Sequence, residues 1–321
     1  MGSDKGRGSA LIIPTLNAGN LADRLIEALA KQSFQANKFL VLDSQSTDGT
    51  ADKFRNAGAT VVEIERANFD HGGTRQFGAD LCDDAEILIY LTQDAIPADP
   101  DAIARLVAAL ADPAIGVAYG RQLPRAEAGP IEVVARLFNY PATDTIVTPK
   151  SASGMGIKAS FCSNSFSAYR ASALAQVGGF PRGTIFGEDT IVAGRLLLAG
   201  WSKAYVSDAA VVHSHGYRIA EEARRYFDVG VLHSREHWLL ESFGRAEGEG
   251  LAFLRMQMAY LLKHDPRLLA SAFVRILVKY AAYRLGLMEA RLPLTFKRKL
   301  SMSPRFWRHP EGVLHGSKLG R

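Results

Sequence analysis

The chain has 321 residues, 47% of them apolar and 22% charged, which is the balance of an ordinary soluble protein able to bury a sizeable core in one or two domains. Its two cysteines, Cys82 and Cys162, are too few for a disulfide framework and lack the spacing of a metal site, so we expect two core thiols in a reducing cytosol. The first apolar run stops at Pro14, and we expect neither a signal peptide nor a membrane span at the N-terminus.

The net charge of +5 is unevenly distributed along the chain. Residues 251–321 contain 14 Lys and Arg against 3 acids, whereas residues 1–250 contain 24 against 30. The basic character therefore belongs to the C-terminal quarter.

Between residues 10 and 119, apolar runs of strand length alternate with helical patterns. The five predicted strands are residues 10–13, 39–42, 60–64, 87–91 and 115–119. Apolar stripes at helical spacing predict helices within residues 21–29 and 103–110. This alternation predicts a series of βαβ units and a mostly parallel sheet.

The pattern weakens over residues 121–160, where we expect a helix at 131–139 and a mobile loop around Gly154 to Gly156. The remaining predicted elements are a strand over 161–169, helices over 171–177 and 189–199, and helical periodicity from 219 to about 288. We find no internal repeat.

Short polar side chains follow three of the predicted strands. Thr15 and Asn17 leave the first strand, Asp43 ends the second, and Asp94 follows the strand over residues 87–91. Ligands bind at the carboxyl edge of open α/β sheets, so Thr15 and Asn17 can face a base or ribose, and Asp43 the imide N–H of uracil or thymine. Asp94 can hold a divalent cation that neutralises two phosphates. Turns and helix caps use the same residue types, and that structural interpretation stays open.

Two predicted helix starts carry glycines or charges. Gly72 and Gly73 precede a helix that carries Arg75, an arrangement that lets backbone amides and a guanidinium approach an anion. Glu188 and Asp189 open another helix, where one of them can be a general base or both can simply favour the helix dipole.

His213 and His215 lie two residues apart on a predicted strand, so both point to one face. That spacing suits a metal or a phosphate. A pair of structural histidines near the sheet edge is the alternative.

Taken in order, these motifs resemble a family 2 glycosyltransferase with the GT-A fold, a Rossmann-like α/β fold with a mostly parallel sheet and helices on both faces. The matching segments are Thr15 and Asn17, Asp43 to Gly49, the Arg75 helix, the Asp94 strand end, Asn164 to Arg170, Val177 to Phe180, Glu188 and Asp189, and Arg195 with Ala199 and Gly200. The resemblance covers residues 9–216. Within the family, residues 69–75, 91–95 and 213–217 look like those of bacterial rhamnosyltransferases that build surface polysaccharides.

The resemblance implies a catalytic domain over residues 1–217, with a nucleotide-sugar half at about 9–120 and an acceptor half at about 121–217, followed by a basic helical region over 218–321. It implies an inverting transfer of L-rhamnose from dTDP-L-rhamnose to a hydroxyl of a saccharide or lipid-linked acceptor. The alternatives are a UDP-sugar donor and a GT-A protein that binds sugar without catalysis.

The resemblance also assigns roles to individual residues. The implied catalytic residues are Asp189 and Glu188, the metal ligands Asp94 and His213, and the acceptor-side residues Asn164 and His215. The implied donor-binding residues are Pro14, Thr15, Asn17, Asp43, His71, Gly72, Arg75, Gln93 and Asp94. Thr92 stands where the family has the first acid of its metal motif, so Mg²⁺ or Mn²⁺ is expected to be held weakly without donor.

Helical segments at residues 251–263 and 268–288 are apolar and cationic but too interrupted to span a bilayer. Residues 296–299 and 305–308 place aromatics beside cations, as peripheral membrane anchors do. We therefore expect a cytoplasmic protein peripheral to the inner membrane face. The alternatives are a solvated basic tail, or a tail that pairs with the acidic first domain or with another subunit. The charge is confined to one end without a recognition motif, so nucleic acid is not an expected partner.

Overall fold

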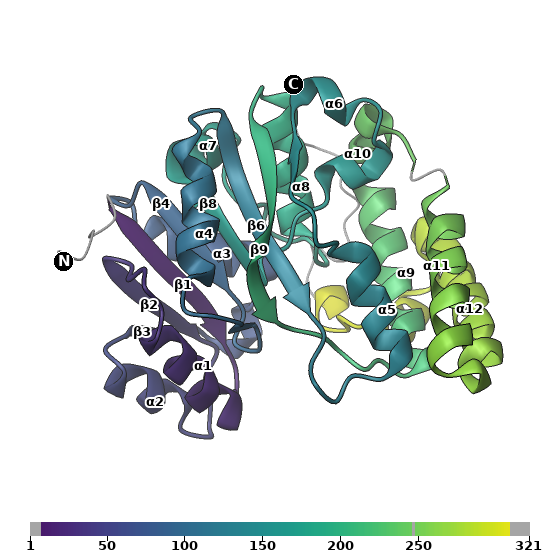
Figure 1. Cartoon of the computed structure of the whole chain (residues 1–321), viewed down its shortest axis with the longest axis horizontal. Coiled ribbons are helices and arrows are strands. Elements are labelled where there is room, and N and C mark those ends of the chain that lie inside the picture. The colour runs from purple at the N-terminus through teal and green to yellow at the C-terminus, as the bar shows by residue number, and fades with distance from the viewer. Residues whose placement is uncertain (1–7, 246–247, 309–321) are drawn as a thin grey trace.

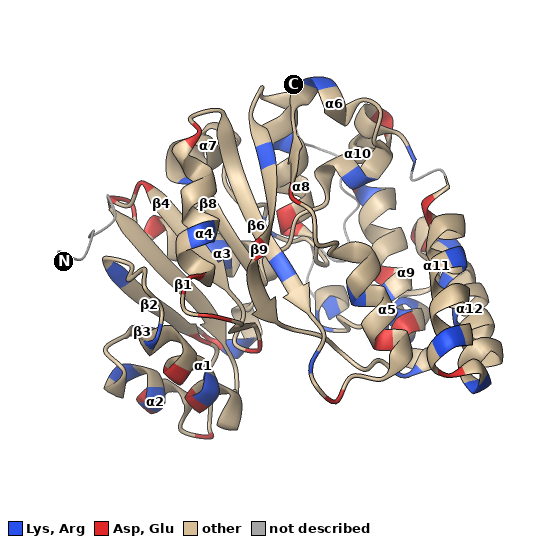
Figure 2. Cartoon of the chain, in the orientation of Figure 1, with Lys and Arg blue, Asp and Glu red and all other residues tan. Residues whose placement is uncertain are grey.

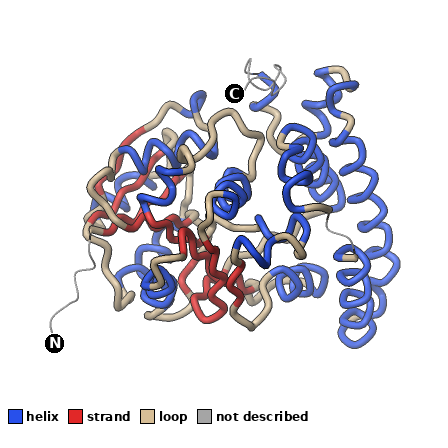
Figure 3. The backbone as a smooth tube through the Cα atoms, turned by 90° about the horizontal axis from the view of Figure 1, so that it is seen from above, coloured by secondary structure: helices blue, strands red, loops and turns tan. Residues whose placement is uncertain are grey.

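The computed structural model describes residues 8–245 and 248–308, so residues 1–7 and the end of the basic region, 309–321, lie outside the described part. The chain folds around one nine-stranded sheet, and its C-terminal helices lie side by side along one flank (Figures 1 and 3). The strands are β1 (Ser9–Thr15), β2 (Lys38–Asp43), β3 (Thr60–Glu63), β4 (Ile87–Leu91), β5 (Ile96–Pro97), β6 (Ile115–Leu123), β7 (Thr145–Val147), β8 (Phe166–Arg170) and β9 (Ser202–Val212). The α-helices are α1 (Asn20–Ala30), α2 (Thr50–Asn56), α3 (His71–Asp80), α4 (Ala102–Ala108), α5 (Pro130–Asn139), α6 (Pro149–Ala152), α7 (Ala171–Gln176), α8 (Glu188–Leu198), α9 (Ile219–Arg235), α10 (His237–Phe243), α11 (Glu249–His264), α12 (Leu269–Leu287) and α13 (Leu294–Leu300).

The strand order is β3-β2-β1-β4-β8-β6-β9-β5, with β7 paired to β9. Strands β3, β2, β1 and β4 are parallel, and β6 is parallel to β9. Between these two groups, β8 is antiparallel to both β4 and β6. The predicted mostly parallel α/β sheet is therefore confirmed, with β5, β7 and β8 as its antiparallel members.

Alternate residues of the strands feed two cores, one on each face of the sheet. On one face, Leu11 and Ile13 of β1 join the buried side chains of α1 and α4. On the other, Ile12 of β1 joins those of α3, α7 and α8. Burial on both faces is why β1, β2 and β4 appear in the sequence as continuous apolar runs. Cys82 and Cys162 are free and buried, as predicted.

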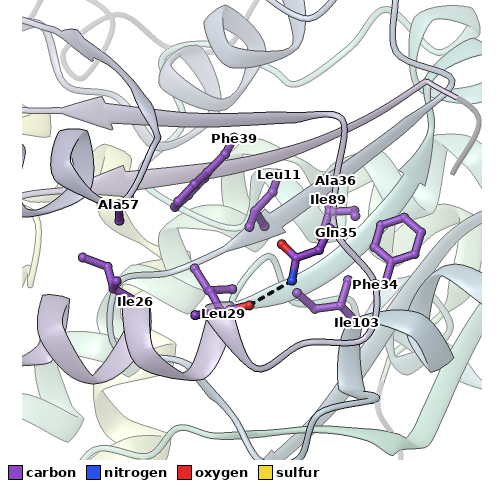
Figure 4. A pocket seen from close by; sticks show the side chains of 11 residues that line it. Leu11, Ile26, Leu29, Phe34, Gln35, Ala36, Phe39, Ala57, Ile89 and Ile103 are labelled. Atoms are coloured by element: carbon purple, nitrogen blue, oxygen red, sulfur yellow. Dashed lines mark hydrogen bonds between the residues drawn. The ribbon is translucent and has the colours of Figure 1, made fainter. Parts of the chain in front are cut away.

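An apolar cavity of about 210 Å³ remains between α1 and the sheet (Figure 4). Its lining is made of aliphatic and aromatic side chains, including Leu11, Phe39 and Ile103. The amide of Gln35 lies at its edge and donates to the carbonyl oxygen of Leu29 at 3.3 Å. With no charged group in its lining, this cavity is a packing feature of the first core.

Two local predictions are wrong. The strand predicted over residues 161–169 is extended only in β8, from Phe166 to Arg170, because Ser163 and Asn164 use their polar groups in side-chain hydrogen bonds rather than in a ladder. His213 and His215 are not on a strand, since β9 ends at Val212.

The C-terminal helices share a core with the sheet domain. Ile191 and Leu197 of α8 belong to the same buried cluster as Phe227 and Val231 of α9 and Trp307. The boundary expected at residue 217 falls in the loop between β9 and α9. Across the described residues, none of the helices combines the length and the apolar character needed to cross a bilayer.

Of the two aromatic and cationic motifs near the C-terminus, that of residues 305–308 does not form the predicted surface anchor, whereas Phe296, Arg298 and Lys299 of the other are exposed. Trp307 is fully buried, with the cations of Arg235 and Lys297 5.2 and 5.1 Å from its ring centroid. Both cations also pair with Glu289, which is 1% exposed. This buried carboxylate holds Lys297 inward. The neighbouring Phe296 is a large apolar side chain that is 59% exposed to solvent.

The crossing of α9 and α12 yields a stability prediction. A Cβ added at Gly286 would lie 2.1 Å from the carbonyl oxygen of Phe227, so the helix backbones are too close for any side chain there. We expect Gly286→Ala to lower the free energy of unfolding by about 1–3 kcal/mol. The control is Gly250→Ala in α11, where nothing lies within 4 Å and alanine should raise stability by up to about 1 kcal/mol. Urea denaturation measures both, and equal effects would contradict the close crossing.

Candidate active site

Polar residues from both halves of the sheet meet at one edge. The contributors are the loops after β1, β2, β4 and β9, the loop before β8, and the starts of α3 and α8. Direct contacts between these segments bring together most of the residues singled out in the sequence.

Asp43 lies at the end of β2 directly beside Thr15 at the end of β1. Its carboxylate is 1% exposed and accepts hydrogen bonds from the hydroxyl of Thr15 at 3.0 Å, and from the hydroxyl and backbone N–H of Ser46 at 2.6 and 2.8 Å. Asp43 is therefore rigidly oriented at the edge where we predicted a base to bind.

The loops after β1 and β2 hold strained backbone. Asn17 and Gln45 have φ angles of 48° and 59°, the positive-φ non-glycine residues of the described chain. Such strain concentrates at binding and catalytic sites. Asn17 is locked by accepting from Thr47 N–H at 2.9 Å. Pro14 does not end β1 as expected, because pairing with β2 continues to Thr15, although pairing with β4 stops at Ile12.

Gln93 connects the loop after β4 to the loop after β1. Its side-chain oxygen accepts from Leu16 N–H at 2.7 Å, and its NH₂ donates to Leu16 O at 3.1 Å. Gln93 therefore clasps the two loops together and positions the neighbouring Asp94.

The glycines at α3 lie inside its first turn rather than before it. Asp70 is the N-cap and accepts from Gly73 N–H at 2.9 Å, and also from Gly183 N–H at 3.0 Å. A Cβ on Gly72 would lie 1.7 Å from the carbonyl oxygen of Pro181. These glycines serve close packing against the chain before α8, which corrects the prediction of an open anion cradle. His71, the first residue of α3, is exposed at this end of the helix.

Arg75 forms a buried ion pair with Glu188, the first residue of α8, at 3.1 Å. Their side chains are 7% and 5% exposed. Burial, the largest single influence, would raise the pKa of Glu188, but Arg75 together with His71 and the hydrogen bond from Asn164 outweighs it and the pKa is lowered. Glu188 is thus the charged partner of Arg75, and it joins α3 to α8.

Asp189 sits next to Glu188 but titrates differently. Burial first, and the negative charge of Glu188 second, raise the pKa of Asp189 to about 6. Asn164 holds both acids, donating its backbone N–H to Asp189 at 3.0 Å and its side-chain NH₂ to Glu188 at 3.1 Å. The amide oxygen of Asn164 in turn accepts from Ser167 and Tyr169, both at 2.8 Å. Asn164, predicted on the acceptor side, therefore positions the acid pair.

Asp94, His213 and His215 form a cluster with the composition of a metal site. One ligand atom from each lies within 4.8 Å of the others. The Asp94 carboxylate is 3.4 Å from His213 Nδ1 and 3.7 Å from His215 Nε2. Burial lowers the pKa of both histidines, in His215 to about 4 with help from His213, so both are neutral and able to ligate.

This cluster extends the sequence prediction. Asp94 and His213 were expected together, but His215 joins them rather than standing apart on the acceptor side. A carboxylate with two imidazoles suits Mn²⁺ better than Mg²⁺, which prefers oxygen ligands. The hydroxyl of Thr92 is buried without a hydrogen-bond partner and supplies no negative charge. The donor set therefore fits a divalent cation but contains a single acid.

Arg136 of α5 is a site residue that sequence reasoning missed. It donates to the side-chain oxygen of Gln122, whose NH₂ donates to Ser163 at 2.9 Å, directly before Asn164. Its Nε is buried without a partner, and among the described residues no carboxylate lies within ion-pair distance of it. Its charge lowers the pKa of His213 and His215. No local pattern identifies it, because it is one cation in an otherwise ordinary amphipathic helix.

A larger cavity, about 620 Å³, lies beside β6, β9 and the segment that precedes β8. Tyr119, Phe161 and Tyr205 line it together with Lys203, whose ammonium donates to the carbonyl oxygens of Ala159 and Phe161 at 2.5 Å. Burial lowers the pKa of Lys203 to about 8. The aromatic lining suits the apolar face of a sugar ring.

Comparison with known proteins agrees with this geometry. The family model "Glycosyl transferase family 2" matches residues 10–178. The O-antigen chain rhamnosyltransferase RfbN of Salmonella typhimurium is 41% identical over 300 residues, covering 92% of this chain and 95% of the relative. The O-antigen chain rhamnosyltransferase WbaN of Salmonella anatum is 37% identical over 299 residues, with the same two coverages.

Solved structures share the fold at low sequence identity. The mannosyltransferase PcManGT from Pyrobaculum calidifontis, in complex with GDP-Man and Mn²⁺, aligns with a TM-score of 0.56 at 22% identity, over 97% of this chain and 87% of that one. S. aureus TarS 1-349, in complex with UDP-GlcNAc, aligns with a TM-score of 0.52 at 17% identity, over 88% of this chain and 91% of that one.

The Arg75–Glu188 pair gives a pH-dependent stability prediction. In Arg75→Met, Glu188 keeps a buried charge without a partner, and we expect the free energy of unfolding at pH 8 to fall by about 3–5 kcal/mol. Without Arg75 the pKa of Glu188 rises, so the carboxyl takes up a proton as the pH is lowered and the deficit shrinks toward pH 5. Urea denaturation at both pH values tests this. In the control, Arg75→Met with Glu188→Gln, the deficit should not shrink in this way, and the same pH dependence in both variants would contradict it.

Proposed function

The chain belongs to glycosyltransferase family 2, and from that premise we propose that it transfers an L-rhamnosyl group from dTDP-L-rhamnose to a saccharide hydroxyl in cell-surface polysaccharide synthesis. The sugar is proposed from the names of the two Salmonella relatives. One observation carries the chemistry. A half-buried carboxyl, Asp189, has a pKa near neutrality and lies at the same sheet edge as the Asp94–His213–His215 cluster.

Asp189 is proposed as the general base of an inverting transfer. It takes the proton of the acceptor hydroxyl while that oxygen forms a bond to the anomeric carbon. The bond from the anomeric carbon to the diphosphate oxygen breaks at the opposite face, and its electrons leave with dTDP. Asn164 keeps Asp189 in place, and burial together with the charge of Glu188 keeps the pKa of Asp189 high enough for it to accept a proton.

Departure of dTDP places negative charge beside the cluster. A divalent cation bound by Asp94, His213 and His215 would offset that charge. Arg136 is proposed to share this role, since its guanidinium has no carboxylate partner in the described structure and lies among the same groups. Asp43, Thr15 and Asn17 are proposed to hold the thymine and ribose, and His71, which is exposed at the start of α3, to lie on the donor side.

The acceptor is proposed to be a lipid-linked saccharide at the cytoplasmic face of the inner membrane. The excess of 14 Lys and Arg over 3 acids in residues 251–321 supports attraction to an anionic surface. The cavity lined by Tyr119, Phe161 and Tyr205 is proposed as a region where further acceptor sugars can bind. A non-catalytic sugar-binding role has less support, because Asp189 keeps the environment of a base.

Donor and metal are tested together by thermal stability and transfer. We expect dTDP-L-rhamnose with Mn²⁺ to stabilise the protein by about 2.7 kcal/mol at a free concentration of 100 times Kd, and UDP-glucose to stabilise it less. Asp94→Asn should lose the Mn²⁺-dependent part while unfolding at the same temperature without ligand. Transfer is followed as dTDP released in the presence of an O-antigen saccharide. Stronger stabilisation by UDP-glucose would overturn the proposed donor.

The base is tested by the pH profile. A base acts deprotonated, so kcat/KM should rise as the pH increases through about 6, the pKa of Asp189. Asp189→Asn should lower kcat/KM by about 10²–10⁴-fold. Around Asp189, Glu188 raises the pKa, while Arg75 and the N–H groups of Asn164 and Thr190 lower it.

Glu188→Gln is the matched variant for this profile. It removes the neighbouring negative charge, so the rising limb should move to lower pH. A limb that stays in place, or an Asp189→Asn variant with wild-type turnover, would show that another group is the base.

A further inference from the structure

Helix α12 has an exposed apolar face, which we call the α12 outer face. Its side chains are each between 37% and 60% exposed and lie on one side of the helix. They are Phe273, Val274, Leu277, Tyr280, Leu285 and Met288. Contiguous exposed apolar side chains on a soluble protein mark an interaction site.

The buried side of α12 explains why these groups point outward. There, Ala272, Ala282 and Gly286 face the interior, and Gly286 lies against the backbone of α9. Lys279 is also inside, with its ammonium 4.9 Å from the ring centroid of Phe253 and 5.3 Å from that of Tyr226. A surface helix normally buries its large apolar residues and exposes its small or charged ones. In α12, by contrast, Lys279 and small residues are buried, the large apolar residues of the α12 outer face are exposed, and Ile276, Val278 and Leu287 are half-buried.

Exposed cations lie on α12 and on the segments next to it. Arg255 and Lys263 on α11, Arg267 between the helices, and Arg284 on α12 are exposed, and no carboxylate of the described chain lies within 4 Å of their charged groups. Arg284 lies over Tyr280 and donates to its hydroxyl at 3.0 Å. Figure 2 shows these helices, with their Lys and Arg, at the edge of the molecule away from α1 and α2.

The charge around the α12 outer face distinguishes between two partners that could cover it, a second copy of the chain and a membrane surface. A second copy of the chain, related by a two-fold axis, would bring these unpaired cations against each other. An anionic bilayer complements them, and apolar groups at the same level can enter the boundary between headgroups and acyl chains. We propose that the α12 outer face docks on an anionic membrane surface, with α12 lying in the plane of the interface.

Docking at this face would also orient the active site. Arg275 of α12 donates to the carbonyl oxygen of Tyr217 at 2.9 Å and pairs with Glu222 at 2.8 Å. The ring of Tyr217 stacks on that of His215, with centroids 5.3 Å apart. The metal-ligand cluster is thus tied to the helix that meets the lipid. This orienting role rests on the proposed transfer to a lipid-linked acceptor, whereas the docking itself does not.

Vesicle co-sedimentation of the full chain tests the docking. We expect binding to vesicles of phosphatidylethanolamine with phosphatidylglycerol at least about tenfold stronger than to phosphatidylcholine alone, and weaker as salt screens the cations. Leu277→Asp should lower the binding about tenfold or more, because it removes an inserted side chain and adds a negative charge. The control is Leu198→Asp, at the end of α8, where the wild-type leucine is 59% exposed compared with 53% for Leu277.

The outcomes separate docking from the proposed function. Loss of binding in Leu277→Asp but not in Leu198→Asp, with unchanged transfer to a soluble saccharide acceptor, supports the proposal. Equal binding by the two variants, or equal binding to neutral and anionic vesicles, overturns it. So does a wild-type dimer, measured by light scattering, that Leu277→Asp dissociates. Absence of transfer from dTDP-L-rhamnose would count against the function alone, because vesicle binding is measured without donor.

Discussion

The buried ion pair between Arg75 and Glu188 is the contact on which the site depends, because it joins helices from the two halves of the sheet. It fixes the start of α8 against α3, and the close approach of Gly72 to Pro181 leaves no room for another arrangement. The same pair sets the electrostatics. Glu188 stays charged because Arg75 compensates it, and that charge, added to burial, raises the pKa of Asp189. The Arg75–Glu188 pair therefore contributes both to the position of Asp189 and to its raised pKa.

The short loop before β8 links Glu188 and Asp189 to the Asp94–His213–His215 cluster. Asn164 holds Glu188 and Asp189, while the next residue, Ser165, has its hydroxyl 3.3 Å from Nε2 of His213. The carbonyl oxygen of Ser165 accepts from Thr92 N–H at 3.2 Å, close to Asp94. A shift of this loop would thus move Asp189 and the Asp94–His213–His215 cluster together. Such a coupling suits the proposed reaction, in which proton removal and departure of the diphosphate must occur on opposite sides of one carbon.

Local sequence patterns were enough for β1 to β4, for β6 and for the positions of the strand-end acids, because a strand that is buried on both faces appears as an apolar run with an abrupt polar end. They did not predict β5, β7 or most of β9. Local sequence patterns were not enough to predict which side chains contact each other. Arg75 with Glu188, and Gln93 with Leu16, are contacts between distant segments that no periodicity reports. The prediction of a membrane anchor around Trp307 was wrong for a related reason. A membrane anchor and a buried cation–π cluster have the same sequence pattern of aromatic residues beside cations. Here the buried carboxylate of Glu289 pairs with the cations and favours the buried cluster.

Helix α12 shows how packing against a neighbour determines what reaches the surface. The backbone contact between Gly286 and α9 leaves no room for a side chain at that position. Ala272, Ala282 and Gly286 are buried on the inner side of α12 together with Lys279, and large apolar residues such as Phe273, Leu277 and Tyr280 are exposed. The α12 outer face therefore accompanies the close crossing of α12 with α9. Leaving it exposed to water gives no stability, so its apolar character is accounted for by a surface that covers it.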